Sequence, residues 1–252
     1  MIQTTHIDNR IIALYNGQDR ARSLINAALQ QRCGRVFVDD LYAPTASYLT
    51  VGRFTCLAGD PNSPALCEAI RTHPPIWIAP ASDEWEHHIV GLLSDRVKYR
   101  PRILFRSDSL DPNRIARFRS TEDPVEPILD NIAASLTSND GSLWGYRSAG
   151  AFLADHIGFT INLKGESICH AGLYAIYDRG IELNVWTHPD HRGKGLATKV
   201  CAHLILDCLD RGLIPHWDAA NTISAGMAEK FGYQPTDTYR MLRPLGPDEE
   251  SP

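Results

Sequence analysis

The sequence predicts a fold that combines helices with a mixed and mostly antiparallel sheet. This is the α+β class, which belongs to the α/β folds in the broad sense of that term. Residues 158–187 hold three strand patterns joined by two tight turns, which is typical of an antiparallel meander. A long amphipathic helix pattern follows over residues 196–209, and Gly212 is placed to end it. The first 110 residues contain shorter helix and strand patterns of their own, which indicate an additional α/β domain.

The amino-terminal region alternates helix and strand patterns. Residues 11–32 repeat apolar side chains every three or four positions, which predicts a helix. Asp83 and Glu86 form a capping-box pattern, which predicts that a second helix opens at Asp83. Between these helices lie strand patterns at 36–38, 47–57 and 76–80.

Basic residues are concentrated between residues 96 and 119. Four of them alternate along a predicted strand and would share one of its faces: Arg96, Lys98, Arg100 and Arg102. Two interpretations follow from this pattern. The residues form either a solvated strand face or an electropositive wall for an anionic substrate or for the phosphates of a cofactor.

The segment 107–127 is rich in Pro, Asp and Ser and is the best candidate for a domain boundary. We therefore expect an N-terminal domain over 1–110, a second domain over 111–245 and a disordered tail over 246–252. The further elements that the sequence predicts are helices at 128–136 and 144–153, a strand at 214–219, a helix at 224–231 and a strand at 236–243.

The composition argues against several classes of protein. The net charge of −5 lacks the basic excess of a nucleic-acid-binding protein. No apolar run approaches the roughly 18 residues of a membrane span, and the chain starts without a signal-peptide pattern. The six cysteines form no CxxC pair, and His87 and His88 point to different sides of a helix, so no metal site is expected. We expect a cytoplasmic monomer or homodimer with reduced thiols.

A glycine-bearing turn precedes the long helix. It consists of Arg192, Gly193, Lys194, Gly195, Leu196 and Ala197. Backbone N–H groups at a helix start lack intrahelical partners, and the helix dipole adds positive potential there, so the turn predicts a site for a phosphate or pyrophosphate. The spacing matches neither the dinucleotide pattern GxGxxG nor the nucleotide-hydrolase pattern GxxxxGK followed by Ser or Thr.

The segment HPDHRGKGLA resembles the acyl-CoA signature of the GNAT acetyltransferases, Q/R-x-x-G-x-G/A, which follows a strand and opens a helix. Arg192, Gly195 and Ala197 occupy its three fixed places. The order of elements over residues 115–243 is also similar to that family. Within it, the segments GFTINLKGESI, IELNVWT, HRGKGLA, CLDRGLIPHWDAAN and EKFGY resemble the branch that includes the zwittermicin A self-resistance acetyltransferase.

This resemblance implies a GNAT fold with acetyl-CoA as the acyl donor. It implies that backbone N–H groups of residues 192–197 bind the pyrophosphate, and that Asn221 reaches the pantetheine arm. The strands that carry Thr187 and Trp217 are expected to separate and admit the acetyl end. Three consecutive residues would present backbone groups to the pantetheine and the thioester carbonyl: Val185, Trp186 and Thr187.

Acetyl transfer needs a base for the amine and an acid for the departing thiolate. Glu182 is the candidate base because it faces the same side of its strand as Asn184 and Trp186, where we expect the cleft. The alternative for Glu182 is a structural ion pair or an anchor for the substrate ammonium. In several relatives the catalytic Glu lies one place nearer the start of the strand, so a bulge would affect this assignment.

The proton donor departs from the family pattern. Ala228 stands where many relatives have a Tyr that acts as the general acid, so the candidates here are Ser224, Tyr233 and water. Asp218 and Trp217 are candidates for binding the substrate amine on the cleft floor. The alternative for Asp218 is a hydrogen bond that holds the separated strand.

These features predict an acetyl-CoA-dependent N-acetyltransferase that acts on the primary amine of a small molecule, such as an antibiotic or an amine metabolite. Two alternatives stay open. The missing Tyr favours a non-catalytic acyl-CoA-binding regulatory module. The arginines within 96–119 favour acetylation of a protein or aminoacyl-tRNA amine, whereas the overall charge opposes the tRNA version. The N-terminal domain is expected to close the acceptor pocket.

Overall fold

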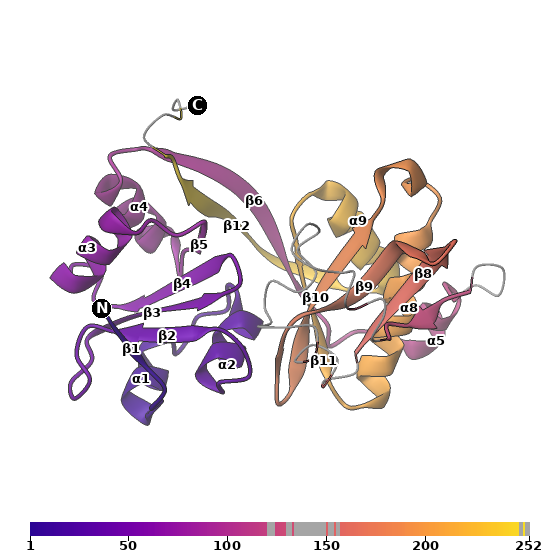
Figure 1. Ribbon diagram of the computed structural model, residues 1–252, viewed down its shortest axis with the longest axis horizontal. Coiled ribbons are helices and arrows are strands. Elements are labelled where there is room, and N and C mark those ends of the chain that lie inside the picture. Colours follow the sequence, from indigo (N-terminus) through magenta and orange to yellow (C-terminus); the bar gives the residue numbers. More distant parts are fainter. Residues whose placement is uncertain are drawn as a thin grey trace. The chain divides into compact units, whose positions relative to one another are not determined.

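The structure is a computed structural model of the chain, and it describes residues 1–119, 124–129, 133, 150, 154, 157–246 and 249. The chain divides into two compact units (Figure 1), Met1–Leu104 with Asp237–Pro252, and Phe105–Thr236. Most of the helices predicted at 128–136 and 144–153, and most of the tail predicted at 246–252, lie outside the described residues.

The first unit is a sheet with helices at its connections. Its strand order is β1-β2-β3-β4-β5-β12-β6, and β4 and β5 are parallel whereas the other pairs among β1–β5 and the pair β5–β12 are antiparallel. The elements are β1 (Ile2–Thr4), α1 (Asn9–Leu14), α2 (Arg22–Leu29), β2 (Arg35–Val38), β3 (Ala46–Val51), β4 (Phe54–Gly59), α3 (Pro64–Thr72), β5 (Trp77–Ala79), α4 (Asp83–Leu92) and most of β6 (Val97–Arg106) and β12 (Gln234–Pro244).

The last strand of the chain belongs to the first unit. Leu242 of β12 lies opposite Ile78 of β5, and both side chains are fully buried. They belong to one apolar cluster that also draws on β3, β4, α3, α4 and β6, with the members Ala46, Leu57, Leu66, Ile70, Ile78, Ile89, Val97 and Leu242. The sequence-based division keeps this strand with the second domain. The structure places this strand in the first unit, because the Leu242 side chain is buried in the apolar core of that unit.

Helix α4 begins at Asp83, but the residue that caps it is Ser82. The capping pattern names Asp83 as the cap, but the Ser82 side chain accepts a hydrogen bond from the Trp85 N–H at 3.2 Å, and Asp83 is the first helical residue. The Asp83 carboxylate instead accepts from Arg20 at 2.8 Å, and Arg20 also donates to Asp237 of β12 at 3.0 Å. Arg20 therefore ties the helix to the returning strand.

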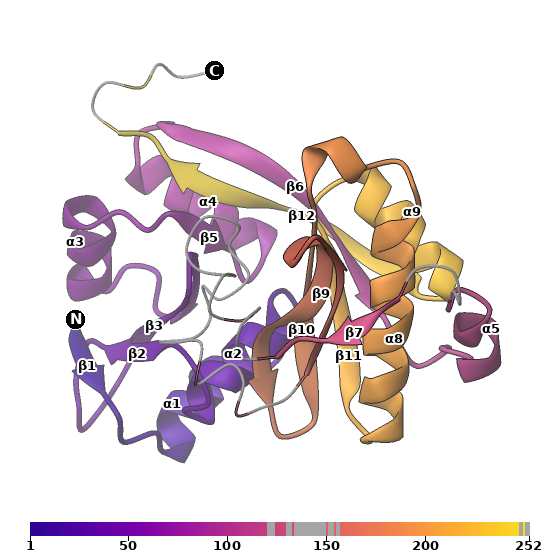
Figure 2. The same cartoon turned by 45° about the vertical axis from the view of Figure 1, so that its right-hand side comes forward.

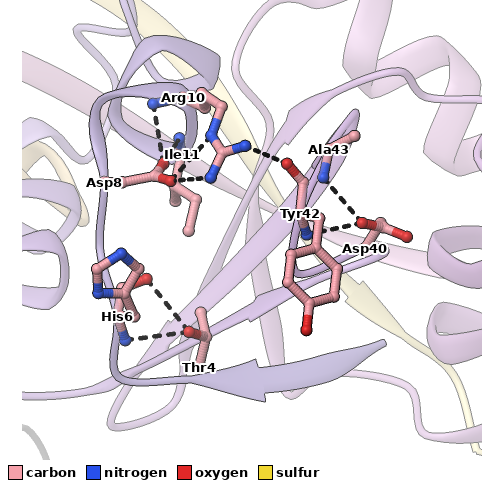
Figure 3. Close-up of polar contacts among 8 residues, drawn as sticks. All are labelled: Thr4, His6, Asp8, Arg10, Ile11, Asp40, Tyr42 and Ala43. Atoms are coloured by element: carbon pink, nitrogen blue, oxygen red, sulfur yellow. Dashed lines mark hydrogen bonds and ion pairs between the residues drawn. The ribbon is translucent and has the colours of Figure 1, made fainter.

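The start of the chain is held to the loop after β2 (Figure 3). The Asp8 side chain caps α1 and accepts from the Arg10 guanidinium at 2.9 Å, and the same guanidinium donates to the carbonyl oxygen of Tyr42. Asp40 accepts from the N–H groups of Tyr42 at 2.7 Å and Ala43 at 2.8 Å. These bonds fix the turn geometry of an exposed loop through its own backbone.

The basic residues between 96 and 119 are divided between the two units, and the four that alternate, Arg96 to Arg102, all lie in the first. In the first unit, the Arg100 guanidinium lies over the Trp77 ring, 5.6 Å from its centroid. In the second unit, Arg114 Nε donates to the Lys230 carbonyl oxygen at 2.9 Å. The stretch therefore supplies local contacts in each unit.

The second unit confirms the α+β class with a mixed, mostly antiparallel sheet. Its strand order is β11-β10-β9-β8-β7; only the pair β10–β11 is parallel. Helix α8 lies along this sheet (Figure 2). The elements are α5 (Pro112–Ala116), β7 (Glu126–Pro127), β8 (Gly158–Leu163), β9 (Glu166–Tyr177), β10 (Gly180–Thr187), the 3-10 turn Pro189–His191, α8 (Leu196–Asp210), β11 (Ile214–Ala219) and α9 (Thr222–Phe231).

The amphipathic pattern of residues 196–209 forms α8 as the sequence predicts. Its buried stripe packs on the sheet, and Gly212 takes a positive φ of 70° after the helix ends at Asp210. All six cysteines are free thiols. Burial raises the pKa of Cys208 on this helix to about 12 and that of Cys169 on β9 to about 11, so both thiols stay protonated and act as packing groups.

The position of β12 in the first unit leads to a stability prediction. Leu242→Ala should lower the free energy of unfolding by about 2–5 kcal/mol, because it leaves a cavity in a closed apolar cluster. Urea unfolding measures the change. The matched control is Leu41→Ala, which removes the same atoms from a side chain that is 45% exposed and should cost about 0.5 kcal/mol or less. Equal losses in the two variants would contradict the assignment of Leu242 to this core.

Candidate functional site

The two central strands of the second unit separate part-way along their length. Strand β11 pairs with β10 only from Gly180 to Glu182, which lie opposite Ile214 to His216. Strand β10 nevertheless continues to Thr187, paired along that whole length with β9 on its other side. The separation that the sequence predicts is therefore present, and it starts directly after Glu182. Beyond it, backbone groups of β10 that point away from β9 have no β11 partner within the described residues.

A bulge lies at the point of separation. Glu182 is opposite Ala175 of β9, but Leu183 is opposite Leu173, so Tyr174 is an extra residue of β9. A bulge increases the local twist of a strand pair, which helps β10 to diverge from β11 at this position. Because the extra residue belongs to β9, the alternation of side chains along β10 is regular through Glu182 and Leu183.

The two faces of β10 have different surroundings. Thr187 lies on the α8 side, where its hydroxyl is 3.2 Å from the Cys169 thiol, and Cys169 is close enough to Cys201 of α8 to affect its pKa. Trp186 lies on the opposite side, stacked on His170 at 5.4 Å between ring centroids. By alternation, Glu182 shares the face of Trp186. This agrees with the sequence-based expectation for the two faces.

The turn before α8 leaves open space beside the helix start. Gly193 and Gly195 have φ angles of 76° and 75°, and a side chain at either position would meet no atom within 4 Å of its Cβ. Gly195 occupies the N-cap position, and no side chain caps the helix. Arg192 Nε donates to the Thr187 carbonyl oxygen at 3.1 Å and Lys194 Nζ to that of Asp190 at 3.1 Å, so the turn is held by its own residues. The helix start can therefore bind an anion.

A polar group lies on the face of the strand pair that is opposite α8. On β11, Pro215, Trp217 and Ala219 are buried and alternate with Ile214, His216 and Asp218, which are half-buried. His216 and Glu182 are opposite each other in the last pair of the β10–β11 ladder, so they share this face. The Tyr177 hydroxyl of β9 is 2.8 Å from His216 Nε2.

Trp217 lies in the core on the α8 side. It is 4% exposed, its indole N–H donates to the Ser224 hydroxyl at 3.1 Å, and its ring packs against Phe231 and Tyr233. Trp217 and Asp218 therefore point to opposite faces of β11, and the structure does not bring them together as a shared amine site. The Trp217 ring is a packing group of this core, and its contact with the substrate stays a prediction.

Tyr233 is a buried packing residue. Its side chain is 3% exposed, and its hydroxyl donates to the Pro215 carbonyl oxygen at 2.9 Å. Burial, with smaller contributions from Cys208 and other nearby groups, holds the pKa of Tyr233 well above its usual value. Ala228, at the place of the usual Tyr, is fully buried too. This arrangement disfavours Tyr233 as the proton donor, because its proton is held by a backbone carbonyl.

Asn221 and Ser224 are joined at the start of α9. Asn221 is the N-cap of this helix, and its side-chain oxygen accepts from the Ser224 N–H at 2.9 Å. The cap uses the oxygen of Asn221, which leaves its amide nitrogen for the predicted pantetheine contact. The Ser224 hydroxyl accepts from Trp217, so its own proton can still be donated.

Comparison with known proteins supplies the family. A sequence model of the GNAT acetyltransferases matches residues 13–242. The chain belongs to the GNAT acetyltransferase family. The match extends over both compact units, so the first unit is part of the family pattern. The protein is accordingly an acyltransferase, and members of this family use acetyl-CoA as donor.

Individual relatives agree with this family. N-acetyltransferase YdfB of Bacillus subtilis strain 168, whose own activity is uncharacterized, is 23% identical over 227 residues, which are 82% of this chain and 84% of YdfB. A crystal structure of a GCN5-related N-acetyltransferase-like protein from Streptococcus suis 89/1591 has 29% identity and a TM-score of 0.81, covering 94% of this chain and 97% of that one.

A more distant structure shares the fold alone. It is a GCN5-related N-acetyltransferase from Kribbella flavida with 17% identity and a TM-score of 0.58, and it covers 90% of this chain and 94% of its own. No helix in the described ranges is both long and apolar enough to cross a membrane. In the same ranges, no three His, Cys, Asp or Glu side chains are arranged to hold a metal ion.

The buried position of Tyr233 leads to a prediction. Tyr233→Phe should lower the free energy of unfolding by about 1 kcal/mol and should not reduce the rate of acyl transfer more than about twofold, since the hydroxyl serves a backbone carbonyl. Thermal or urea unfolding and a rate assay measure the two effects. A large loss of rate in a variant that folds normally would return Tyr233 to the list of proton donors.

Proposed function

We propose that this protein transfers the acetyl group of acetyl-CoA to the primary amine of a small molecule. The observation that carries the proposal is the combination of two features in direct succession along the chain. The strands β10 and β11 separate after Glu182, and β10 then leads into an uncapped helix start with open space beside it. A thioester on a long arm that ends in a pyrophosphate fits this succession.

The residues present suit such a donor. The pyrophosphate would lie on the N–H groups of the turn at 192–197, where no side chain competes for the helix start. The pantetheine would run along the edge of β10 that β11 leaves, and its amides would pair with backbone groups of Val185 and Trp186. The Thr187 carbonyl already accepts from Arg192, so we assign it a smaller part in this pairing. Asn221 would add a contact through its amide nitrogen.

The chemistry requires a neutral amine that attacks the thioester carbonyl carbon. Backbone N–H groups on the open edge of β10 would stabilise the oxyanion that develops on the carbonyl oxygen. Glu182 is the proposed base because it stands where the opening begins, on the face opposite α8. Asp218 shares that face of β11, so the two carboxylates would attract an ammonium group and orient it for deprotonation.

The acceptor is proposed to be a small amine, such as an antibiotic or another amine-bearing metabolite. The resemblance to the branch of the zwittermicin A self-resistance acetyltransferase supports this class by analogy. The acidic pair Glu182 and Asp218 supports a cationic acceptor. The net charge of −5 disfavours aminoacyl-tRNA as the carrier of the amine. The absence of a Tyr at Ala228 is the feature that favours a non-catalytic acyl-CoA-binding module.

A thiol-release assay tests the proposed function. The protein is incubated with acetyl-CoA and a panel of amines that includes diamines, amino sugars and amino acid amides, and free CoA is measured with a thiol reagent. We expect release that depends on both the protein and the amine, with the acetylated amine identified by mass spectrometry. If CoA binds tightly in calorimetry but no amine yields free thiol, the non-catalytic module becomes the better description.

The helix start makes a separate prediction about the donor. Gly195→Glu should weaken CoA binding by about 100-fold, because a carboxylate next to the pyrophosphate juxtaposes like charges. Isothermal calorimetry measures the affinity. The matched control is Gly212→Glu at the other end of the same helix, where φ is 70° and a Cβ also meets no atom within 4 Å.

Both variants place a non-glycine residue at a positive φ, so each should lose a similar stability of about 1–2 kcal/mol. Only Gly195→Glu should lose CoA affinity. An equal affinity in the two variants would show that the anion site lies elsewhere.

A further inference from the structure

A second titratable group stands at the point where the strands separate. His216 is the last residue of β11 that pairs with β10, and its partner in that pair is Glu182. Paired residues on neighbouring strands are about 4.8 Å apart and direct their side chains to the same face. The imidazole and the carboxylate therefore stand side by side at the inner end of the opening, on the face that also carries Asp218.

The side chain of Tyr177, on strand β9, holds the imidazole of His216 in place. The Tyr177 hydroxyl lies 2.8 Å from His216 Nε2, and the rings are 5.7 Å apart between centroids. Tyr177 is 6% exposed, so its ring is fixed by packing and positions the imidazole rather than following it. Strand β10 lies between β9 and β11, so this contact must pass over β10.

Gly180 leaves the space that the Tyr177 side chain needs to cross β10 and reach His216. This residue of β10 lies opposite Tyr177 on one side and Ile214 on the other. A Cβ at Gly180 would lie 3.1 Å from Cε1 of the Tyr177 ring and 2.4 Å from the Ile214 carbonyl oxygen. Only glycine leaves room for the Tyr177 ring above the strand and for the close approach of β11. The glycine at position 180 thus makes the contact between Tyr177 and His216 possible.

We propose that His216, in place of Glu182, carries the proton in acetyl transfer, with Glu182 as its charged neighbour and Tyr177 as its positioning residue. This inference rests on the proposed function. As the C–N bond forms, the imidazole accepts the proton that the amine nitrogen loses. As the C–S bond breaks, the imidazolium gives that proton to the CoA sulfur, so no proton is gained or lost overall. Glu182 and Asp218 stabilise the imidazolium between the two steps.

This assignment explains a departure from the family pattern. Ala228 leaves no Tyr to protonate the thiolate, and the Tyr233 hydroxyl is committed to the Pro215 carbonyl. A single imidazole that first accepts and then donates removes the need for a separate acid. Imidazole is suited to both steps because its ordinary pKa is close to neutral pH.

The first test compares two histidine variants. His216→Gln should lower kcat by about 100-fold or more while the Kd for CoA stays within about twofold, since a base contributes to transfer and not to donor binding. The control His87→Gln changes a histidine of α4 in the first unit and should leave kcat unchanged. Imidazole added to His216→Ala should restore part of the rate, and a purely structural role would not respond to it.

The positioning role of Tyr177 has its own readout. Tyr177→Phe retains the ring and removes the hydroxyl, so it should fold, lower kcat and shift the acid limb of the kcat/KM pH profile. His216→Gln should remove that limb. If Tyr177→Phe loses stability but keeps the wild-type kcat and pH profile, Tyr177 is only a packing residue and this part of the inference is wrong.

A titration that needs no turnover separates this inference from the proposed function. The C2 proton of His216 is followed by NMR in the wild type and in Glu182→Gln, and it is assigned by its loss in His216→Gln. Removing the carboxylate should lower the pKa of His216. An active wild type whose rate survives His216→Gln would overturn the role of His216 and leave the proposed function standing.

A wild type that releases no thiol with any amine would overturn the proposed function instead. In that case the NMR titration of His216 still tests whether His216 and Glu182 are coupled. A lowered pKa of His216 in Glu182→Gln would support the coupling of the two groups, and an unchanged pKa would overturn it.

Discussion

The parallel ladder between β10 and β11 stops at Glu182 and His216, and the candidate site depends on that stop. A continued ladder would close the edge of β10 with backbone hydrogen bonds and leave no room for a ligand. The stop instead leaves polar backbone groups that need another partner, which is water or a bound molecule. The bulge at Tyr174 turns β10 away at the same position, so twist and opening have one local origin.

The two faces of the strand pair β10–β11 have different roles: one packs in the core, and the other carries the candidate reactive groups. On the α8 side, Trp217 and Tyr233 are buried and bond to Ser224 and the Pro215 carbonyl, which makes this side a rigid support. On the other side, polar side chains gather where the strands part. A strand gives this separation at no extra cost, because adjacent residues always point in opposite directions.

The sequence predicts the elements of the second unit well because its signals are local. The meander shows alternation and tight turns, and the signature turn comes directly before an amphipathic helix. Alternation also shows that Trp217 and Asp218 face apart, so the pattern alone places only one of them on the face of Glu182. By contrast, the bulge at Tyr174 and the contact between Tyr177 and His216 depend on register between strands. Register and the return of β12 to β5 are non-local and leave no local pattern.

The return of β12 has a consequence for the order in which the protein can fold. This strand lies between β5 and β6 in its sheet, yet more than one hundred residues of the second unit separate it from β6 along the chain. A ribosome therefore completes the second unit before it delivers β12, the strand that joins β5 to β6 in the first. Until then, the edges of β5 and β6 remain exposed as templates for wrong pairing. The inserted unit is thus the part of the chain that can fold first during synthesis, although it comes second in the sequence.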